Sequence, residues 1–241
     1  MTITIPTALE AQLEAYNPWT TFLVVDVETT GLVHTNEDGT PGPDRVVELA
    51  AALFENGRHT ETFVQRINPE RPIPPEVSAI HGVSDADVVG APLFPESWAK
   101  LCELAQRAPM ALAYNEPFDR PCCRAEVRRA NLPQPPLALR WPWIDPLPFV
   151  WKADRYIKGK GRHKLTAACE RRGVTLERAH SADADAIAAG QLWVSMEREV
   201  RSMVGGPFSI SALLRVQHAL AEERERDFQA WLARQPKRPA A

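Results

Sequence analysis

The chain lacks the features that mark several common classes of protein. No stretch approaches the roughly 18 consecutive apolar residues that a membrane-spanning helix needs, and the first residues have no basic segment typical of a secretory signal. Its four cysteines, Cys102, Cys122, Cys123 and Cys169, form no C-x-x-C pair, and no histidine cluster completes a zinc site. Cys122 and Cys123 are adjacent and are poor disulfide partners for each other. We therefore expect a reduced, cytoplasmic protein with no membrane contact.

A surplus of positive charge is also missing. Lys and Arg number 28 against 31 Asp and Glu, which gives a formal net charge of −3, so any contact with a polyanion depends on a local basic patch. The 241 residues are 44% hydrophobic and 24% charged, which indicates a globular chain with a sizeable core rather than a disordered one.

The pattern of apolar residues and breakers predicts an α/β fold with strands of mixed direction. Most strands come first, and later helices enclose one more strand. The Asn-Gly pair in "ENGR" predicts a hairpin turn, and prolines exclude regular helix from 68–76. We expect strands at 21–28, on both sides of "ENGR" and at 110–115; a loop at 34–44; irregular chain at 132–148; and helices at 95–107, 118–131, 146–155, 164–172, 182–203 and 209–234.

Two carboxylates end the first predicted strand, in the stretch "FLVVDVETTGL". On a strand Asp26 and Glu28 point to the same face, roughly 6.5–7 Å apart, and Phe22 and Val24 continue that face. Two unpaired anions at the end of an apolar face repel each other and lose hydration. A bound cation or an exposed strand end explains them equally well from this motif alone.

Asp119 and Asp185 head two further apolar faces. Asp119 lies in the first turn of the predicted helix after "YNEP", and Asp185 lies near the start of the helix that follows "HSADADA", where Ser181 is a plausible N-cap. Each alone is explained by the helix dipole or by solvent. Together with Asp26 and Glu28 they converge on one core, and four carboxylates suit hard divalent cations. A pair of such ions is the usual device for in-line attack on a phosphodiester.

The stretches "VVDVETTGL", "YNEPFD" and "HSADADA" resemble the three motifs of the DEDDh 3′→5′ exonucleases, and "INPERPIPPEVSAIHGVSDADV" is similar to the branch formed by the proofreading subunits of bacterial DNA polymerase III. The resemblance covers about residues 20–200. It implies an RNase H-like fold with a mixed central sheet of about five strands flanked by helices. It also implies a domain at 20–204, preceded by a lead-in at 1–19 and followed by a helical extension with a frayed tail at 205–241.

The resemblance also implies roles for individual residues. Asp26, Glu28, Asp119 and Asp185 would bind two Mg²⁺ ions, for which Mn²⁺ would substitute, and His180 would be the general base. Ser181 stands where the related tyrosine branch has its tyrosine, which excludes that branch. The residues matched to the pocket for the terminal nucleotide are Thr29, Thr30, Gly31, Leu32 and His81, although His81 has a structural turn role as its alternative. The family's His-Asn-Ala before Phe-Asp is replaced here by Tyr114-Asn115-Glu116-Pro117, which adds a carboxylate near the site.

The basic stretch "KADRYIKGKGRHK" is the candidate for contact with a nucleic-acid backbone, through Lys158, Lys160 and Arg162. A solvated loop is an equally good explanation of this charge. The function expected is hydrolysis of single-stranded or frayed DNA from its 3′ end, with release of nucleoside 5′-monophosphates. An RNA-trimming exoribonuclease and a catalytically silent nucleic-acid-binding module are the alternatives. The helix at 209–234 could dock a protein partner or pack on the domain itself, and the sequence does not indicate an oligomeric state.

Overall fold

The computed structural model describes residues 16–140, 143–157, 159–176 and 181–234. Its strands are β1 (Phe22–Thr29), β2 (Val46–Glu55), β3 (Arg58–Arg66) and β4 (Ala111–Leu112). Its helices are α2 (Pro75–His81), α3 (Asp85–Val88), α4 (Phe94–Ala105), α5 (Glu116–Arg129), α6 (Leu137–Arg140), α7 (Pro146–Ala153), α8 (Leu165–Arg171), α9 (Ala182–Ser195), α10 (Glu197–Val204) and α11 (Ile210–Ala233). Within these ranges no helix combines the length and apolarity needed to cross a membrane.

The four strands form one mixed sheet in the order β3-β2-β1-β4. β1 and β3 run antiparallel to β2, whereas β4 is parallel to β1. The expected hairpin turn is present, since Asn56 and Gly57 both adopt positive φ between β2 and β3. The mixed α/β sheet is confirmed, but the described sheet has four strands rather than about five. Beside β4, Ile144 makes one parallel bridge with Leu112 among the described residues, and α7 begins two residues later at Pro146.

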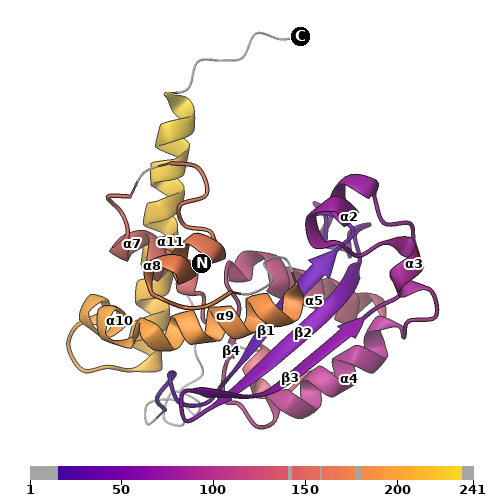
Figure 1. Ribbon diagram of the computed structural model, residues 1–241, viewed down its shortest axis with the longest axis horizontal. Coiled ribbons are helices and arrows are strands. Elements are labelled where there is room, and N and C mark those ends of the chain that lie inside the picture. Colours follow the sequence, from indigo (N-terminus) through magenta and orange to yellow (C-terminus); the bar gives the residue numbers. More distant parts are fainter. Residues whose placement is uncertain (1–15, 141–142, 158, 177–180, 235–241) are drawn as a thin grey trace.

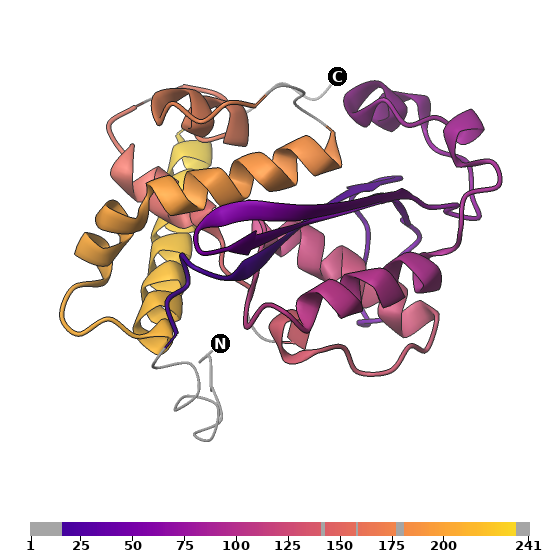
Figure 2. The ribbon, with the colours of Figure 1, turned by 60° about the horizontal axis from the view of Figure 1, so that its bottom comes forward.

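Helices cover both faces of this sheet (Figure 2). α4 and α5 pack on one face, around residues such as Leu23, Val25 and Leu49. α9 crosses the other face, and α7, α8, α10 and the first half of α11 complete the core around it. The residues of β1 alternate between the two cores, so Phe22 and Val24 belong to the α9 side. Asp26 and Glu28 therefore point toward α9.

The structure corrects four expectations about helices. α2 begins at Pro75, inside the stretch expected to be non-helical, because a proline is compatible with the first turn of a helix. α3 was not expected at all, and α6 forms one turn within the chain expected to be irregular. The helix expected at 182–203 divides into α9 and α10. At the division the Ser195 hydroxyl donates to the Leu192 carbonyl at 2.7 Å, a bond that competes with the helical pattern.

Candidate active site

The C-terminal end of β1 carries Asp26 and Glu28 on the side of the sheet that α9 covers. Figure 1 shows α9 passing over β1. Asp26 lies opposite Ala50 of β2, and Glu28 lies opposite Glu48. Both β1 carboxylates are half-buried, whereas the alternating Val25 and Val27 are buried on the other face. The strand thus holds two acids two residues apart, with a third acid directly across the antiparallel pair.

α5 adds Asp119 beside the same strand end. β4 pairs with β1 only through Leu112 and Ala111, so it ends before Val27 is reached. There the Val27 N–H donates to Asp119 Oδ1 at 3.0 Å, and Asp119 as a whole is 3% exposed. Asp119 therefore takes the place of a strand partner while remaining a neighbour of the β1 carboxylates.

The N-terminus of α9 supplies Asp185 in its first turn. Ser181 is the N-cap residue, as expected, but its hydroxyl donates to Asp183 and caps no helix N–H. Instead, the Ala182 N–H lies 3.4 Å from Glu48 Oε2, so a carboxylate from β2 holds the start of the helix. Glu48 is 9% exposed and was not among the predicted site residues.

Three of the four predicted ligands form a compact cluster. Asp26, Glu28 and Asp185 each offer a carboxylate oxygen, and these three oxygens lie within 4.8 Å of one another. Asp119 adjoins them closely enough that its charge acts on Asp26. The structure thus brings together all four carboxylates that the motifs predicted, from β1, α5 and α9.

The closeness of these carboxylates makes their ionised forms unfavourable. Burial raises the pKa of Asp26 well above its ordinary value, and the charges of Asp119, Glu28, Asp185 and Glu48 raise it further. Burial, with Asp185 and Glu48, raises the pKa of Glu28 to about 8. Burial also raises the pKa of Asp119, although the hydrogen bond from Val27 opposes the shift. Like charges in a desolvated cluster disfavour ionisation.

The cluster fits a divalent cation by its donor set. Its donors are carboxylate oxygens, the ligands that hard cations such as Mg²⁺ and Mn²⁺ prefer. A cation at this point would replace repulsion among the acids by attraction, and would favour the ionised form of each. No lysine or arginine forms an ion pair with Asp26, Glu28 or Asp119 in the described ranges of the chain.

The turn after β1 contains the residues matched to the terminal-nucleotide pocket. Thr29 and Thr30 are buried, and their hydroxyls donate to Gly31 O at 2.8 Å and to Asp44 Oδ1 at 3.2 Å. Asp44 also accepts from the Val33 N–H at 2.7 Å, and it lies so close that a Cβ on Gly31 would be 2.5 Å from its carboxylate. The threonine side chains and Gly31 therefore fix the turn, while Leu32 projects from it with 81% of its surface exposed.

His81 supports the same turn from the end of α2. Its Nδ1 accepts from the Val83 N–H at 3.0 Å, so Nε2 carries the proton and donates to Thr29 O at 3.2 Å. Burial lowers the pKa of His81, which favours this neutral form. Both ring nitrogens are thereby committed to backbone groups.

Four predicted residues remain, and the structure describes two of them, Lys160 and Arg162. Arg162 lines a cavity of about 560 Å³ that reaches Asp185, together with Tyr114, Asn115 and residues 163–166. Lys160 is exposed in the adjoining segment. The expected general base His180 and the basic residue Lys158 lie outside the described residues. Glu116, the carboxylate added by the altered second motif, is paired with Arg120 at 2.8 Å.

Hydrogen bonds connect the C-terminal helix α11 to the start of α5 through residues 143–145. Gln217 of α11 accepts from the Asp145 N–H at 3.0 Å, and its amide donates to Trp143 O at 3.0 Å. The Asp145 carboxylate in turn accepts from the Asn115 N–H at 2.9 Å, and Asn115 is the N-cap of α5 with φ of 71°. α11 therefore helps to fix the helix that carries Asp119.

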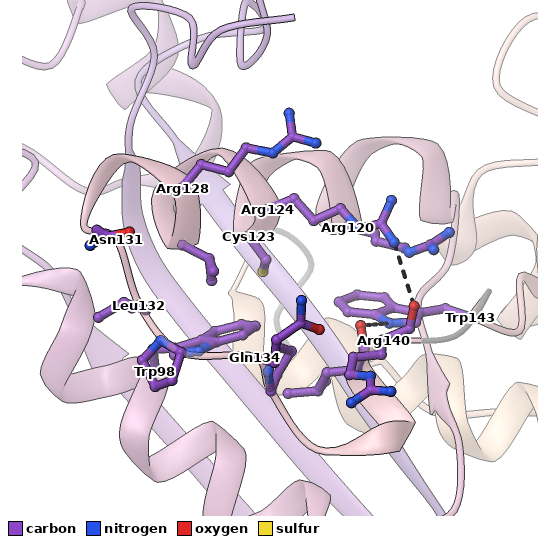
Figure 3. A pocket seen from close by; sticks show the side chains of 14 residues that line it. Trp98, Arg120, Cys123, Arg124, Arg128, Asn131, Leu132, Gln134, Arg140 and Trp143 are labelled. Atoms are coloured by element: carbon purple, nitrogen blue, oxygen red, sulfur yellow. Dashed lines mark hydrogen bonds between the residues drawn. The ribbon is translucent and has the colours of Figure 1, made fainter.

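A basic cavity of about 640 Å³ lies along α5 and is separate from the carboxylate cluster (Figure 3). Arg120, Arg124 and Arg128 follow one side of α5, and Arg140 faces them with its carbonyl accepting from Arg124 at 3.5 Å. Its lining contains no carboxylate and none of the predicted site residues, so its charge suits an anion rather than a metal ion.

Comparison with known proteins gives a match over most of the fold. A family model described as an exonuclease, RNase T, matches residues 23–193, which is more than half of the chain. A "DNA polymerase III subunit epsilon-like protein" of Rhodobacter capsulatus is 31% identical over 181 residues, which cover 73% of this chain and 23% of that protein. The chain spans less than a quarter of the length of the curated relatives that it matches.

Solved structures share the fold at lower sequence identity. Exonuclease X in complex with 5′-overhanging duplex DNA has a TM-score of 0.58 and 19% identity, over 81% of this chain and 99% of that one. The nuclease domain of 3′hExo, a DEDDh family member bound to rAMP, has a TM-score of 0.60 and 19% identity, over 77% of this chain and 95% of that one. The expected RNase H-like exonuclease fold is confirmed by these matches.

Proposed function

The chain belongs to the RNase T family of exonucleases and is of the DEDDh type, and we propose that it hydrolyses nucleic acid from the 3′ end with two Mg²⁺ ions. The observation that supports the proposal most strongly is the convergence of Asp26, Glu28 and Asp185 within 4.8 Å, next to Asp119. Such a cluster is unfavourable for the fold unless cations bind it. Mn²⁺ is expected to substitute for Mg²⁺ because it accepts the same oxygen ligands.

In this proposal each part of the site has a separate task. The four carboxylates hold the ions, and the turn from Thr29 to Leu32 receives the terminal nucleotide. When bound, the ions would supply positive charge that favours ionisation of the attacking water and stabilises the negative charge that develops on the leaving 3′ oxygen. His180 accepts the proton of that water, which requires a neutral imidazole near pH 7. A new P–O bond forms with the water oxygen, the bond from phosphorus to the 3′ oxygen breaks, and a nucleoside 5′-monophosphate leaves.

We favour DNA over RNA as the substrate. The support is the resemblance of residues 67–88 to the polymerase III branch and the similarity to a polymerase III epsilon-like protein. The alternative is RNA, which is supported by the fold shared with a nuclease domain that was solved with rAMP. Single-stranded or frayed ends are the form of substrate that a pocket for one terminal nucleotide can accept.

The test is digestion of DNA and RNA strands of the same sequence, labelled at either end, with Mg²⁺ or Mn²⁺. We expect 5′-labelled DNA to shorten progressively, 3′-labelled DNA to release a labelled mononucleotide at once, and RNA to react more slowly. Asp26→Ala should abolish the reaction, whereas Glu37→Ala, an exposed acid in the 34–44 loop, should not. Activity that survives Asp26→Ala, or that begins at the 5′ end, contradicts the proposal.

A further inference from the structure

Two neighbouring cavities connect the carboxylate cluster with the outer half of α11. The first, of about 560 Å³, reaches Asp185. The second, of about 610 Å³, lies against the C-terminal half of α11. Gly159, His163 and Arg224 line both cavities. The space beside the predicted catalytic site is therefore continued along the helix rather than closed at Arg224.

The outer half of α11 exposes aromatic rings to this space. The first half of the helix is buried through Ile210, Leu213, Leu214 and Leu220, whereas the second half extends beyond the rest of the fold (Figure 1). Phe228 and Trp231 are 49% and 50% exposed, and their rings stack with centroids 5.9 Å apart. Trp151 of α7 lines the same cavity. The apolar residues of α11 therefore divide into a buried group and an exposed aromatic pair.

Arginine and lysine side chains line the same two cavities as these rings. Arg162, Arg224 and Arg234 line the two cavities, and none of the three has a carboxylate within ion-pairing distance in the described chain. Arg155 and Lys164 are also in the lining, which has Glu225 and Asp227 as its acids apart from Asp185. Cations therefore outnumber acids along the path, although the whole chain has a net charge of −3.

We propose that α11 and the segment 159–165 bind the single strand that lies behind the 3′-terminal nucleotide. In this arrangement Arg162 and Arg224 contact phosphates near the carboxylates, and bases further toward the 5′ end stack on Phe228 and Trp231. Aromatic platforms beside a basic groove are the general means by which proteins bind single strands without reading sequence. The inference rests on the proposed exonuclease function, and it adds strand-binding residues on α11, which lies outside the residues matched by the family model, 23–193.

A single strand of nucleic acid fits the two cavities along α11 better than a docked protein does. The cavities lead to Asp185, where a 3′ end must arrive, and arginines lie both beside the cluster and beside the aromatic pair. A nucleic acid presents phosphates and bases alternately along its length, which matches guanidinium groups and rings on the same path. A protein partner on α11 would have no reason to continue to the carboxylates.

The test compares long and short substrates with matched variants of the full chain. Phe228→Ala with Trp231→Ala removes the aromatic pair, and Leu232→Ala is the control because it is exposed on the same helix but lines neither cavity. Arg224→Gln is paired with Arg226→Gln, an exposed arginine outside both cavities. Affinity for a fluorescent strand of about 16 nucleotides is measured by anisotropy in EDTA, and hydrolysis of a dinucleotide is measured separately with Mg²⁺.

We expect the aromatic double variant to bind the long strand about tenfold more weakly or worse, and Arg224→Gln to bind it more weakly with a reduced salt dependence. Dinucleotide hydrolysis by the aromatic variant should match that of the unaltered protein. Long-strand affinity equal to that of Leu232→Ala, or equal losses on long and short substrates, overturns the strand-binding site. Failure of the unaltered protein to hydrolyse either substrate overturns the exonuclease function instead, while the binding measurement still decides the strand-binding site.

Discussion

At the scale of single residues, Glu48 is the part of the site that the motifs did not indicate. It lies opposite Glu28, its Oε2 faces the Ala182 N–H, and its Oε1 is 3.5 Å from Arg66. A signal for it was present, because Glu48 interrupts the apolar run "VVELAAALF" just as Asp26 and Glu28 end theirs. Only the cross-strand register places it beside them, and sequence does not give that register.

Glu48 should act on the site by positioning α9. Glu48→Ala leaves the Ala182 N–H without its acceptor, and we expect kcat to fall about ten- to hundredfold because Asp185 is displaced. Glu48→Gln keeps an acceptor oxygen and should stay within about threefold of the unaltered protein. The comparison is made on single-stranded DNA at equal folded fraction, measured by circular dichroism. Equal losses in the two variants would show that the charge of Glu48 matters rather than its hydrogen bond.

At the scale of elements, α9 is held against the sheet by a close approach at Gly190. A Cβ at this position would be 2.2 Å from Phe54 of β2, a ring that stacks on Phe22. We expect Gly190→Ala to lower the free energy of unfolding by about 2 kcal/mol through overpacking, despite the better helix propensity of alanine. Urea unfolding measures this loss. A double variant with Phe54→Leu should recover part of it, and strict additivity of the two changes would contradict the proposed contact.

A half-buried group of ion pairs joins the helices beyond the sheet. Asp154, at the end of α7, accepts from Arg171 at 2.6 Å and from Arg172 at 3.1 Å, and Arg172 continues to Glu199 of α10 at 3.0 Å. Burial acts to raise the pKa of Asp154, but the hydrogen bonds and charges of the two arginines outweigh it, and the pKa is lowered overall. The Asp154 carboxylate thus binds its proton more weakly in the folded chain than in the unfolded one.

The lowered pKa of Asp154 determines how the stability of the fold depends on pH. Because the folded-state pKa lies below the unfolded value of about 3.9, the stabilisation is fully present above that pH and is lost as the pH falls through the folded pKa. Because the pair is partly solvated and screened, Asp154→Asn should cost about 1 kcal/mol at pH 7 and progressively less below about pH 4. Urea unfolding across this range measures the loss, with Glu199→Gln as an exposed control expected to cost less than about 0.5 kcal/mol. A cost for Asp154→Asn that persists unchanged at low pH contradicts the assignment.

Most elements were predictable because their signals are local. The alternation of β1, the Asn56-Gly57 turn and the apolar faces of α4 and α5 all lie within a few residues of sequence. The division between α9 and α10 was not predictable, because it has no glycine or proline and depends on the Ser195 hydroxyl. Within the described residues the expected fifth strand is reduced to one bridge at Ile144, because α7 begins two residues later at Pro146.

At the scale of the whole molecule, the position of α11 bears on where the domain ends. The division of the chain at residue 205 stays a prediction, yet Ile210, Leu213 and Leu214 are buried in the same core as α9, and Gln217 holds Asp145. We expect a chain ending at residue 221 to keep the fold and one ending at 208 to lose it. Thermal unfolding followed by circular dichroism distinguishes the two. A cooperative transition in the shorter chain at an unchanged temperature would place α11 outside the domain.

The convergence of the four carboxylates was predictable from sequence, since Asp26 and Glu28 end the apolar face of one strand and Asp119 and Asp185 each head the apolar face of a helix. The path along α11 was not, because Phe228 and Trp231 have the helical spacing of core residues and only tertiary structure shows them exposed. Whether an apolar stripe on a helix is buried in the core or exposed as a binding surface depends on how the helix packs in the tertiary structure, and not on its local sequence.

Calorimetric titration of the protein with Mn²⁺ in the absence of nucleic acid measures whether the carboxylate cluster binds a metal ion. We expect binding by the unaltered chain, and affinity lower by at least about tenfold in each of Asp26→Asn, Glu28→Gln and Asp185→Asn. Asp38→Asn, which changes an exposed acid of the 34–44 loop, should bind as the unaltered chain does. Unchanged Mn²⁺ affinity in the three cluster variants, with their fold intact by circular dichroism, would contradict the claim that these carboxylates form a metal site.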